Sequence, residues 1–366
     1  MNYMSEQMAL NTQIKELLHK GTVIPAHPLV LGENRDLDEE RQRRLTRYYM
    51  ASGAGGVAVG VHTTQFEIRK PEVNLLETVL RLTAEEIGEA QLTYPFVKVA
   101  GVVGPTPNAL NEAALAVKYG YDLGLVSLGG LSDYSETDLI EHIRAVSEII
   151  PVFGFYLQPA VGGRILSFNF WKQFVEIPNI HAIKVAAFNR YQTLDVVRAV
   201  CNSARRNQIA LYTGNDDNIV ADLLTPYRFK VNGELVEKRF VGGLLGHWAV
   251  WTKKATELLA EIKRCLANNG EGMDNLLAKG IAVIDMNEVI FDARNSFHGC
   301  IPGIHEVLRR QKLLEGRWCL NPKEELSTGQ LEEIERVYQQ YPELTDDAFV
   351  ERFLAKDKES AWHGSK

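Results

Sequence analysis

The chain has 366 residues, of which 45% are hydrophobic and 24% are charged, a composition typical of a globular protein. Its 40 Lys and Arg residues against 47 Asp and Glu residues give a net charge of −7, so it has no general electrostatic attraction to nucleic acid or to an anionic membrane. Four cysteines without a CxxC pair exclude the usual spacing of a thiolate zinc site and indicate reduced thiols. The N-terminal segment lacks the apolar core of a signal peptide, and no run of about 18 apolar residues predicts a membrane span. We therefore expect a cytoplasmic protein whose partners include neither nucleic acid nor a membrane.

Short apolar segments recur along the chain as far as residue 246. Several are nearly continuous runs of Val, Ile and Leu, which are typical of parallel strands buried on both faces. The predicted strands are 22–30, 56–61, 96–103, 124–128, 151–157, 180–186, 208–214 and 240–246. Longer amphipathic segments between the strands predict helices, the first with Asp36 as its cap and Gly53 as its stop.

Eight strands that alternate with helices are the pattern of an α/β fold of the (β/α)8 TIM-barrel type. An open, doubly wound sheet is the main competing architecture, but no GxGxxG motif follows an early strand, which disfavours its dinucleotide-binding version. The dipeptide NG between alternating residues predicts a hairpin at 227–240.

The pattern changes near residue 271, where helices follow one another without strands. These helices are predicted at 271–281, 302–313, 328–341 and 346–355, with an ambiguous segment at 283–293. We therefore predict a barrel with an N-terminal helical segment over residues 1–268, and a C-terminal helical extension over residues 269–366.

Lys184 is the most informative residue of the predicted active-site end of the barrel, where the strands finish. It lies within the apolar segment IHAIKVA. Burial disfavours the ammonium ion and lowers the pKa of a lysine, and a neutral amine can attack a ketone to form a Schiff base. The alternative is a lysine that extends to solvent or pairs with a carboxylate. The pattern by itself leaves both interpretations open.

Tyr156, Thr63 and Thr64 are further candidates at strand ends. Tyr156 could move a proton between the substrate and an imine nitrogen, or it could be a core tyrosine bonded to the backbone. Thr63 and Thr64 could bind a carboxylate, or they could cap the helix that follows.

Taken in this order, these residues resemble the dihydrodipicolinate synthase / N-acetylneuraminate lyase family of class I aldolases. IHAIKVA is similar to that family's Schiff-base strand, and FYLQP to its YxxP motif, whose tyrosine is the proton relay. HTTQF stands in the place of the GTTGE loop, whose threonines bind the substrate carboxylate, and TGNDD resembles the SGDD-type turn after strand seven. The segment NSFHGCIPGIHEVLRRQKLL is similar to the family's helical tail, so the resemblance covers about residues 20–320.

The resemblance implies a covalent Schiff base on Lys184 with no other cofactor, and Tyr156 as the relay. It also implies a site for a small 2-oxo acid at His62, Thr63, Thr64 and Gly214. Members of this family are commonly tetramers built from dimers, so a homo-oligomer, either a dimer or a tetramer, is expected.

The chain departs from the family pattern in three places. HTTQF lacks the glycine and the glutamate of GTTGE, and Gly129 and Gly130 stand where synthase members carry a tyrosine pair. Val161 stands where synthases place a substrate-binding arginine, and Arg164, three residues on, could bind substrate only in a reshaped loop. These losses argue against an authentic dihydrodipicolinate synthase. They favour a lyase or aldolase that cleaves or forms a C–C bond next to pyruvate or another 2-oxo acid, or a dehydratase of a 2-keto-3-deoxy acid.

Two alternatives belong to other classes. His27, His62, His247 and Asp216 could converge on a divalent metal, although no HxH or HExxH spacing supports a ligand set, so no metal is expected. The protein could also be a non-catalytic 2-oxo-acid-binding protein that has lost turnover.

Overall fold

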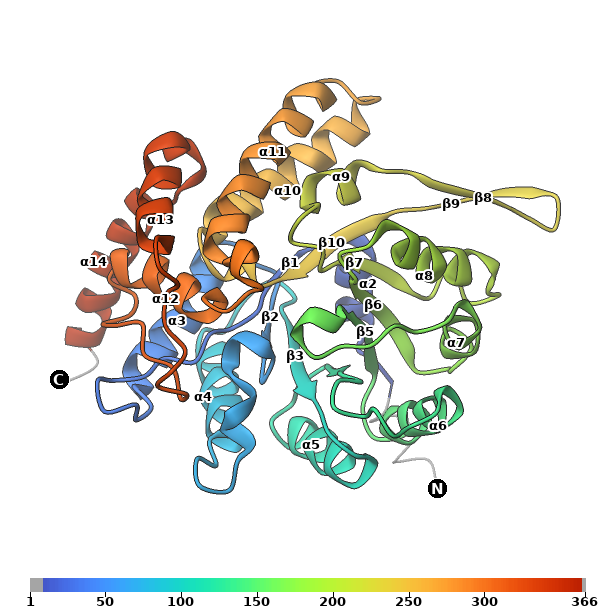
Figure 1. The fold of residues 1–366 in the computed structure, drawn as a ribbon, viewed down its shortest axis with the longest axis horizontal. Coiled ribbons are helices and arrows are strands. Elements are labelled where there is room, and N and C mark those ends of the chain that lie inside the picture. The colour runs from blue at the N-terminus through green and yellow to red at the C-terminus, as the bar shows by residue number, and fades with distance from the viewer. Residues whose placement is uncertain (1–8, 364–366) are drawn as a thin grey trace.

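The computed structural model describes residues 9–363, and over this range eight parallel strands form a barrel (Figure 1). Their order around the sheet is β1, β10, β7, β6, β5, β4, β3, β2, and a parallel bridge between Ala26 and Ala58 joins its two ends. The predicted TIM barrel is therefore confirmed, with a strand at each predicted position. The strands are β1 (Val23–Pro25), β2 (Gly56–Val59), β3 (Val97–Val102), β4 (Leu123–Val126), β5 (Val152–Leu157), β6 (Ile180–Ala186), β7 (Ala210–Thr213) and β10 (Phe240–Leu245).

The strands are apolar on both faces because each face packs against a different partner. On β6, Ile183 and Val185 belong to the cluster between the sheet and the outer helices, whereas Ala182 and Ala186 belong to the cluster inside the barrel. Successive side chains of a strand point to opposite faces, so Lys184 points inward with the two alanines. This alternation decides which residues of every strand can reach the barrel interior.

The outer helices follow the strands along the chain. The first begins two residues later than predicted: Asp38, and not Asp36, caps it by accepting from the backbone amide of Arg41, and Gly53 follows its end with φ of 83°. The helices are α3 (Glu39–Ala51), α4 (Leu76–Glu89), α5 (Thr106–Lys118), α6 (Glu136–Ser147), α7 (Phe168–Phe174), α8 (Arg190–Asn202), α9 (Ile219–Leu224) and α10 (Thr252–Ala267).

A hairpin of β8 (Tyr227–Val231) and β9 (Glu234–Lys238) extends away from the barrel (Figure 1). Asn232 and Gly233 at its turn have φ of 51° and 88°, the left-handed backbone that a tight two-residue hairpin turn requires. The predicted hairpin is confirmed.

Helix α2 (Thr12–Lys20) covers the amino-terminal end of the barrel. Ile14 and Leu18 pack with the apolar residues inside the barrel, and the hydroxyl of Tyr212 donates to the carbonyl of Leu18 at 3.1 Å. This leaves the opposite end of the barrel as the accessible one. Residues 1–8, which belong to the segment in which we found no signal peptide, lie outside the described residues.

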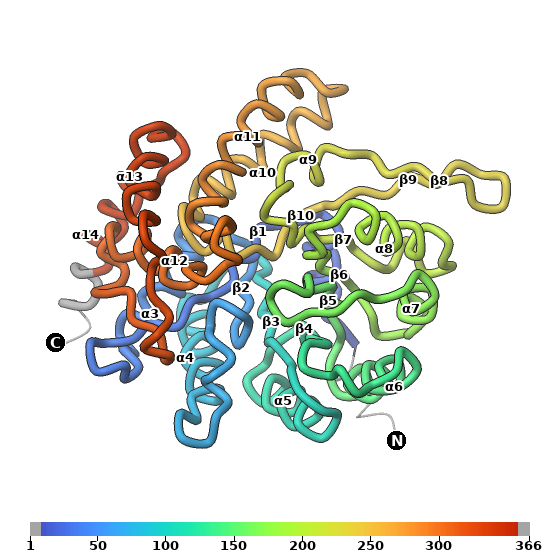
Figure 2. The backbone as a smooth tube through the Cα atoms, in the orientation of Figure 1, coloured from blue at the N-terminus to red at the C-terminus, as the bar shows by residue number. Residues whose placement is uncertain are grey.

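The C-terminal extension consists of α11 (Met273–Ile290), α12 (Cys300–Arg310), α13 (Gln330–Gln340) and α14 (Asp347–His363). Helix α11 extends through most of the segment that was ambiguous in the sequence and ends at Ile290. Figure 2 shows α14 beside α3, where the guanidinium of Arg47 pairs with Asp357 at 2.6 Å. The hydroxyl of Tyr48 on α3 also donates to Asp346 at 2.7 Å, so the extension is bonded to the barrel wall. Within the described residues, no helix is both long and apolar enough to cross a membrane.

Candidate active site

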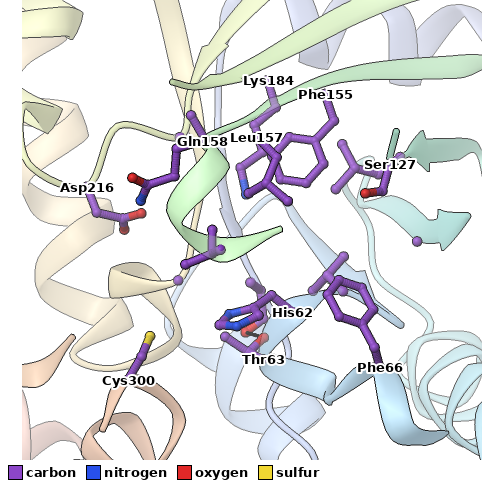
Figure 3. A pocket seen from close by; sticks show the side chains of 18 of the residues that line it. His62, Thr63, Phe66, Ser127, Phe155, Leu157, Gln158, Lys184, Asp216 and Cys300 are labelled. Carbon is purple, nitrogen blue, oxygen red and sulfur yellow. Dashed lines mark hydrogen bonds between the residues drawn. The ribbon is translucent and has the colours of Figure 1, made fainter. Parts of the chain in front are cut away.

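A cavity opens at the carboxyl ends of the barrel strands, where side chains from several strands face one another (Figure 3). Its position agrees with the rule that barrel active sites form at this end. The polar side chains that line it are His62, Thr63, Ser127, Gln158, Lys184 and Asp216.

Lys184 extends into this cavity from β6. Its ammonium nitrogen lies 4.6 Å from the ring centroid of Phe155, the residue in register with it on β5. Burial lowers the pKa of Lys184, and the carboxylate of Asp216 acts in the opposite direction. Lys184 therefore loses its proton more readily than a lysine in water, and the neutral amine that results is the form that nucleophilic attack requires.

Gly214 makes room for this lysine. A β-carbon at position 214 would lie 2.5 Å from Lys184 Cε and 2.9 Å from Ala186 Cβ. Gly214 lines the cavity, as the resemblance implied, and the absence of a side chain there leaves space for Lys184.

Asp216 is the residue that our site prediction left out, apart from the metal alternative. It is buried in the turn after β7 and lines the cavity with Lys184. The backbone amide of His247 donates to its Oδ1 at 3.0 Å, which fixes the carboxyl group. Burial raises the pKa of Asp216, and Lys184 acts in the opposite direction. The repeated Asp of TGNDD was a visible signal for a carboxyl group at this strand end.

The loop after β2 forms a short 3₁₀ turn, His62–Thr64, and only some of its residues line the cavity. His62 and Thr63 line the cavity, and the first amides of such a turn have no partner within it. The Thr63 hydroxyl donates to the carbonyl of Ala26 at 2.9 Å. Burial lowers the pKa of His62 to about 4, with a further contribution from Lys184, so its imidazole is neutral near pH 7.

Thr64 does not line the cavity. Its hydroxyl donates to the carbonyl of His27 at 2.7 Å and accepts from the amides of Gly60 and Val61 at 3.0 and 3.2 Å. The hydroxyl is thus engaged in joining the ends of β1 and β2, and it does not fit the carboxylate-binding role that we expected.

Tyr156 lies on the other face of β5 from the cavity, which corrects our placement of a proton relay. Its neighbour Phe155 is in register with Lys184, so Phe155 points inward and Tyr156 outward. The Tyr156 ring packs 5.2 Å from Trp171 of α7, and its hydroxyl accepts from the Leu166 amide at 3.3 Å. Tyr156 is therefore the core tyrosine of our alternative interpretation.

Arg164 is also outside the cavity, and the role in substrate binding expected of it is not supported. Its guanidinium donates to the carbonyls of Leu131 and Tyr134, both at 2.9 Å. Both bonds come from Nη1, and they join the loop of Arg164 to the loop after β4.

The histidines proposed for a metal site do not converge. His27 bonds through one ring nitrogen to the carbonyl of Pro28 and through the other to Thr46 Oγ1. The His247 ring packs against Trp251 with its centroid 5.9 Å away. Among the described residues, no group of three or more His, Cys, Asp and Glu side chains is arranged to hold a metal ion.

The C-terminal extension also contributes to the cavity, which the sequence did not predict. Phe291, Phe297 and Cys300 lie between α11 and α12 or at their ends, and all three line the cavity. Burial raises the pKa of the Cys300 thiol, which is therefore neutral near pH 7. Gly246 leaves space for Phe291, because a β-carbon there would lie 2.8 Å from that ring.

The dihydrodipicolinate synthetase family model matches residues 21–226 of the chain. The chain is 27% identical over 205 residues to N-acetylneuraminate lyase of Citrobacter koseri, an alignment that covers 55% of this chain and 65% of that protein. It is 25% identical over 193 residues to N-acetylneuraminate lyase of Salmonella typhi, with 52% of this chain and 61% of that protein covered. The chain thus matches less than two thirds of the length of these relatives.

Solved structures resemble a larger part of the molecule. Dihydrodipicolinate synthase from Oceanobacillus iheyensis has a TM-score of 0.71 at 15% identity, over 90% of this chain and 99% of that chain. N-acetylneuraminate lyase from Fusobacterium nucleatum, complexed with pyruvate, has a TM-score of 0.69 at 16% identity over the same shares of the two chains. At these identities the likeness shows the fold.

Proposed function

Because the chain belongs to the dihydrodipicolinate synthetase family, we propose that it is a class I lyase that forms a Schiff base between Lys184 and pyruvate or another 2-oxo acid. The observation that carries this proposal is the position of Lys184, which is buried and extends into the cavity at the carboxyl end of the barrel. Burial lowers the pKa of Lys184, which favours the nucleophilic form of the amine.

The chemistry requires only the chain's own side chains. The neutral amine adds to the ketone carbon, and loss of water gives an iminium ion. In the cleavage direction the C3–C4 bond of the substrate breaks, its electrons move to the iminium nitrogen, and an aldehyde leaves. Protonation of the resulting enamine at C3 and addition of water release the 2-oxo acid and the free lysine. Loss of water from a 2-keto-3-deoxy acid would use the same iminium ion.

Asp216 is the group that we assign to proton transfer in place of Tyr156. It lines the same cavity as Lys184, and its Oδ1 is held by the His247 amide, so its second oxygen has a defined direction. In the cleavage direction this carboxylate accepts the proton of the C4 hydroxyl, and in the synthetic direction the carboxylic acid returns it. Burial raises the pKa of Asp216, which suits a group that exchanges protons near pH 7.

The substrate carboxylate is assigned to the 3₁₀ turn after β2. The backbone amides of His62 and Thr63 are at the start of this turn, which lines the cavity. Uncharged His62 can donate or accept there without repelling the protonated imine.

Borohydride trapping tests the proposal. Incubation of the protein with pyruvate and borohydride should attach a reduced pyruvate adduct to the peptide that contains Lys184, and Lys184→Arg should abolish both the adduct and turnover. Lys98→Arg is the matched control, because Lys98 is a half-buried lysine on β3 that does not line the cavity. Absence of an adduct with each of several 2-oxo acids would overturn the proposal.

A non-catalytic 2-oxo-acid-binding protein is the second candidate, favoured by the outward position of Tyr156 and the engaged guanidinium of Arg164. Such a protein would form the adduct on Lys184 but release no aldehyde from any hydroxylated 2-oxo acid. Turnover assays beside the trapping experiment separate the two candidates.

A further inference from the structure

The cavity has two layers along the strand direction. Lys184, Ala186 and Phe188 are alternate residues that rise from β6 toward the mouth, and all three line the cavity. On β5, Phe155 is in register with Lys184, and Leu157 with Ala186. A substituent carried by a 2-oxo acid bound to Lys184 therefore extends past this second pair toward the mouth.

The mouth itself is largely apolar. Its partly exposed lining side chains are Phe66, Val103, Leu157, Val161, Phe188 and Phe297, together with the uncharged imidazole of His62. Among the described residues that line the cavity, the acidic and basic side chains are Lys184 and Asp216, apart from the neutral imidazole of His62. The guanidinium of Arg164 is bonded to two carbonyls outside the cavity, so no arginine at this position meets a second carboxylate.

Two phenylalanines at the mouth are held in an unfavourable backbone conformation. Phe188 and Phe297 have φ of 50° and 66°, in the left-handed region that bulky side chains rarely adopt. Asn215 Oδ1 accepts from the Phe188 amide at 2.9 Å, and the Asp292 carbonyl from the Phe297 amide at 3.0 Å. The two rings meet edge to face, with centroids 6.1 Å apart and planes at 80°. Strain of this kind is typical of residues whose side chains must point at a site.

We propose that the aldehyde that contributes C4, released in cleavage and added in synthesis, is apolar and specifically aromatic. It binds against Phe188 and Phe297. This inference rests on the proposed Schiff-base function. The planar ring of an aromatic aldehyde can stack or pack edge to face with these two rings. The hydroxyl groups of a sugar-like aldehyde, or the carboxylate of an acidic one, would lose their hydrogen bonds to water at this mouth. The apolar side chains there offer them no partners in return.

The test is a competition among aldehydes in the synthetic direction. The full-length protein receives pyruvate with benzaldehyde, D-glyceraldehyde or succinic semialdehyde, and the hydroxylated 2-oxo acid product is measured by mass spectrometry. We expect kcat/KM for benzaldehyde to exceed the other two values by about 100-fold. An equal or greater value for D-glyceraldehyde or succinic semialdehyde would overturn the inference.

Phe297→Ser should lower kcat/KM for benzaldehyde at least about tenfold and reduce its advantage over D-glyceraldehyde. Phe229→Ser is the matched control, because Phe229 is a partly buried phenylalanine on the projecting hairpin, away from the cavity. Formation of the pyruvate adduct, which needs no aldehyde, reports whether each variant still folds around Lys184.

The two proposals fail differently. If wild-type protein forms no adduct with pyruvate or other 2-oxo acids, the Schiff-base function is wrong and this inference falls with it. If the adduct forms on Lys184 but a hydroxylated or acidic aldehyde is preferred, only the apolar aldehyde is wrong.

Discussion

Gly214 is the residue on which the freedom of Lys184 depends. A methyl group at this position would lie 2.5 Å from Lys184 Cε, closer than any van der Waals contact allows, so the lysine side chain would have to move. We predict that Gly214→Ala lowers the rate of pyruvate adduct formation by about 100-fold, because small displacements of a reacting group have effects of this size. The measurement is the rate of borohydride trapping, read by intact mass.

Gly88→Ala is the matched control for this change. A β-carbon at Gly88, near the end of α4, would meet no atom within 4 Å. Its trapping rate should equal that of wild type. An unchanged rate in Gly214→Ala would mean that the lysine does not need this space.

The pH dependence of trapping depends on the pair of Lys184 and Asp216. Burial lowers the pKa of Lys184 and the Asp216 carboxylate raises it, so removing the carboxylate lowers it further. We predict that Asp216→Asn shifts the midpoint of the trapping rate to lower pH, because the amine then loses its proton more readily. Turnover should fall by about 10²–10⁴-fold while trapping persists, since the amide cannot transfer a proton.

Asp217→Asn tests whether the effect is specific. Asp217 is the adjacent carboxyl group, but it is exposed and does not line the cavity. The Asp217→Asn variant should retain turnover, and the pH midpoint of its trapping rate should stay close to that of wild type. A midpoint for Asp216→Asn that stays in place or moves to higher pH would contradict the assigned pairing.

At the scale of elements, the loop after β2 depends on Thr64. Its buried hydroxyl makes three hydrogen bonds that hold the ends of β1 and β2 together, so Thr64→Val leaves buried backbone groups without partners. We predict a loss of about 1–3 kcal/mol in the free energy of unfolding, measured by urea denaturation. The effect of Thr64→Val on the free energy of unfolding should be larger than its effect on the binding of pyruvate.

Thr345→Val is the corresponding control, because that hydroxyl donates only locally, to the carbonyl of Pro342. Its free energy of unfolding should stay within about 0.5 kcal/mol of wild type. If Thr64→Val kept wild-type stability and weakened pyruvate trapping, the hydroxyl would act on the substrate after all.

At the scale of the whole molecule, the barrel and the C-terminal extension share one hydrophobic cluster. The cluster includes Tyr48 and Val197 of the barrel helices and Ile304 and Val337 of the extension. Phe291, Phe297 and Cys300 also complete the cavity of the barrel. We expect the two parts to unfold as one cooperative unit.

The buried cysteines provide natural probes of this cooperativity. Cys201 and Cys265 belong to the barrel, and Cys300 and Cys319 to the extension. We predict that all four become reactive toward a thiol reagent at the same urea concentration, as measured by peptide mass spectrometry. Labelling of Cys319 at a clearly lower urea concentration than Cys201 would show that the extension unfolds separately.

Local chemistry determined much of this molecule. Nearly continuous runs of Val, Ile and Leu indicate strands that are buried on both faces. The barrel follows from the alternation of eight such strands with helices. Asn232 and Gly233 tolerate the left-handed backbone that a tight turn needs, so the hairpin follows from two residues. Lys184 was recognisable because a charged residue in an apolar strand requires a reason.

The tertiary structure alone decided which side chains meet at the cavity. The register between β5 and β6 points Phe155, and not Tyr156, toward Lys184, because a shift of one residue moves a side chain to the opposite face. Arg164 found its acceptors on a different loop, at Leu131 and Tyr134, which no local pattern reveals. Phe297 reaches the cavity from more than 100 residues away, because contacts of this kind form only when the C-terminal helices pack on the closed barrel.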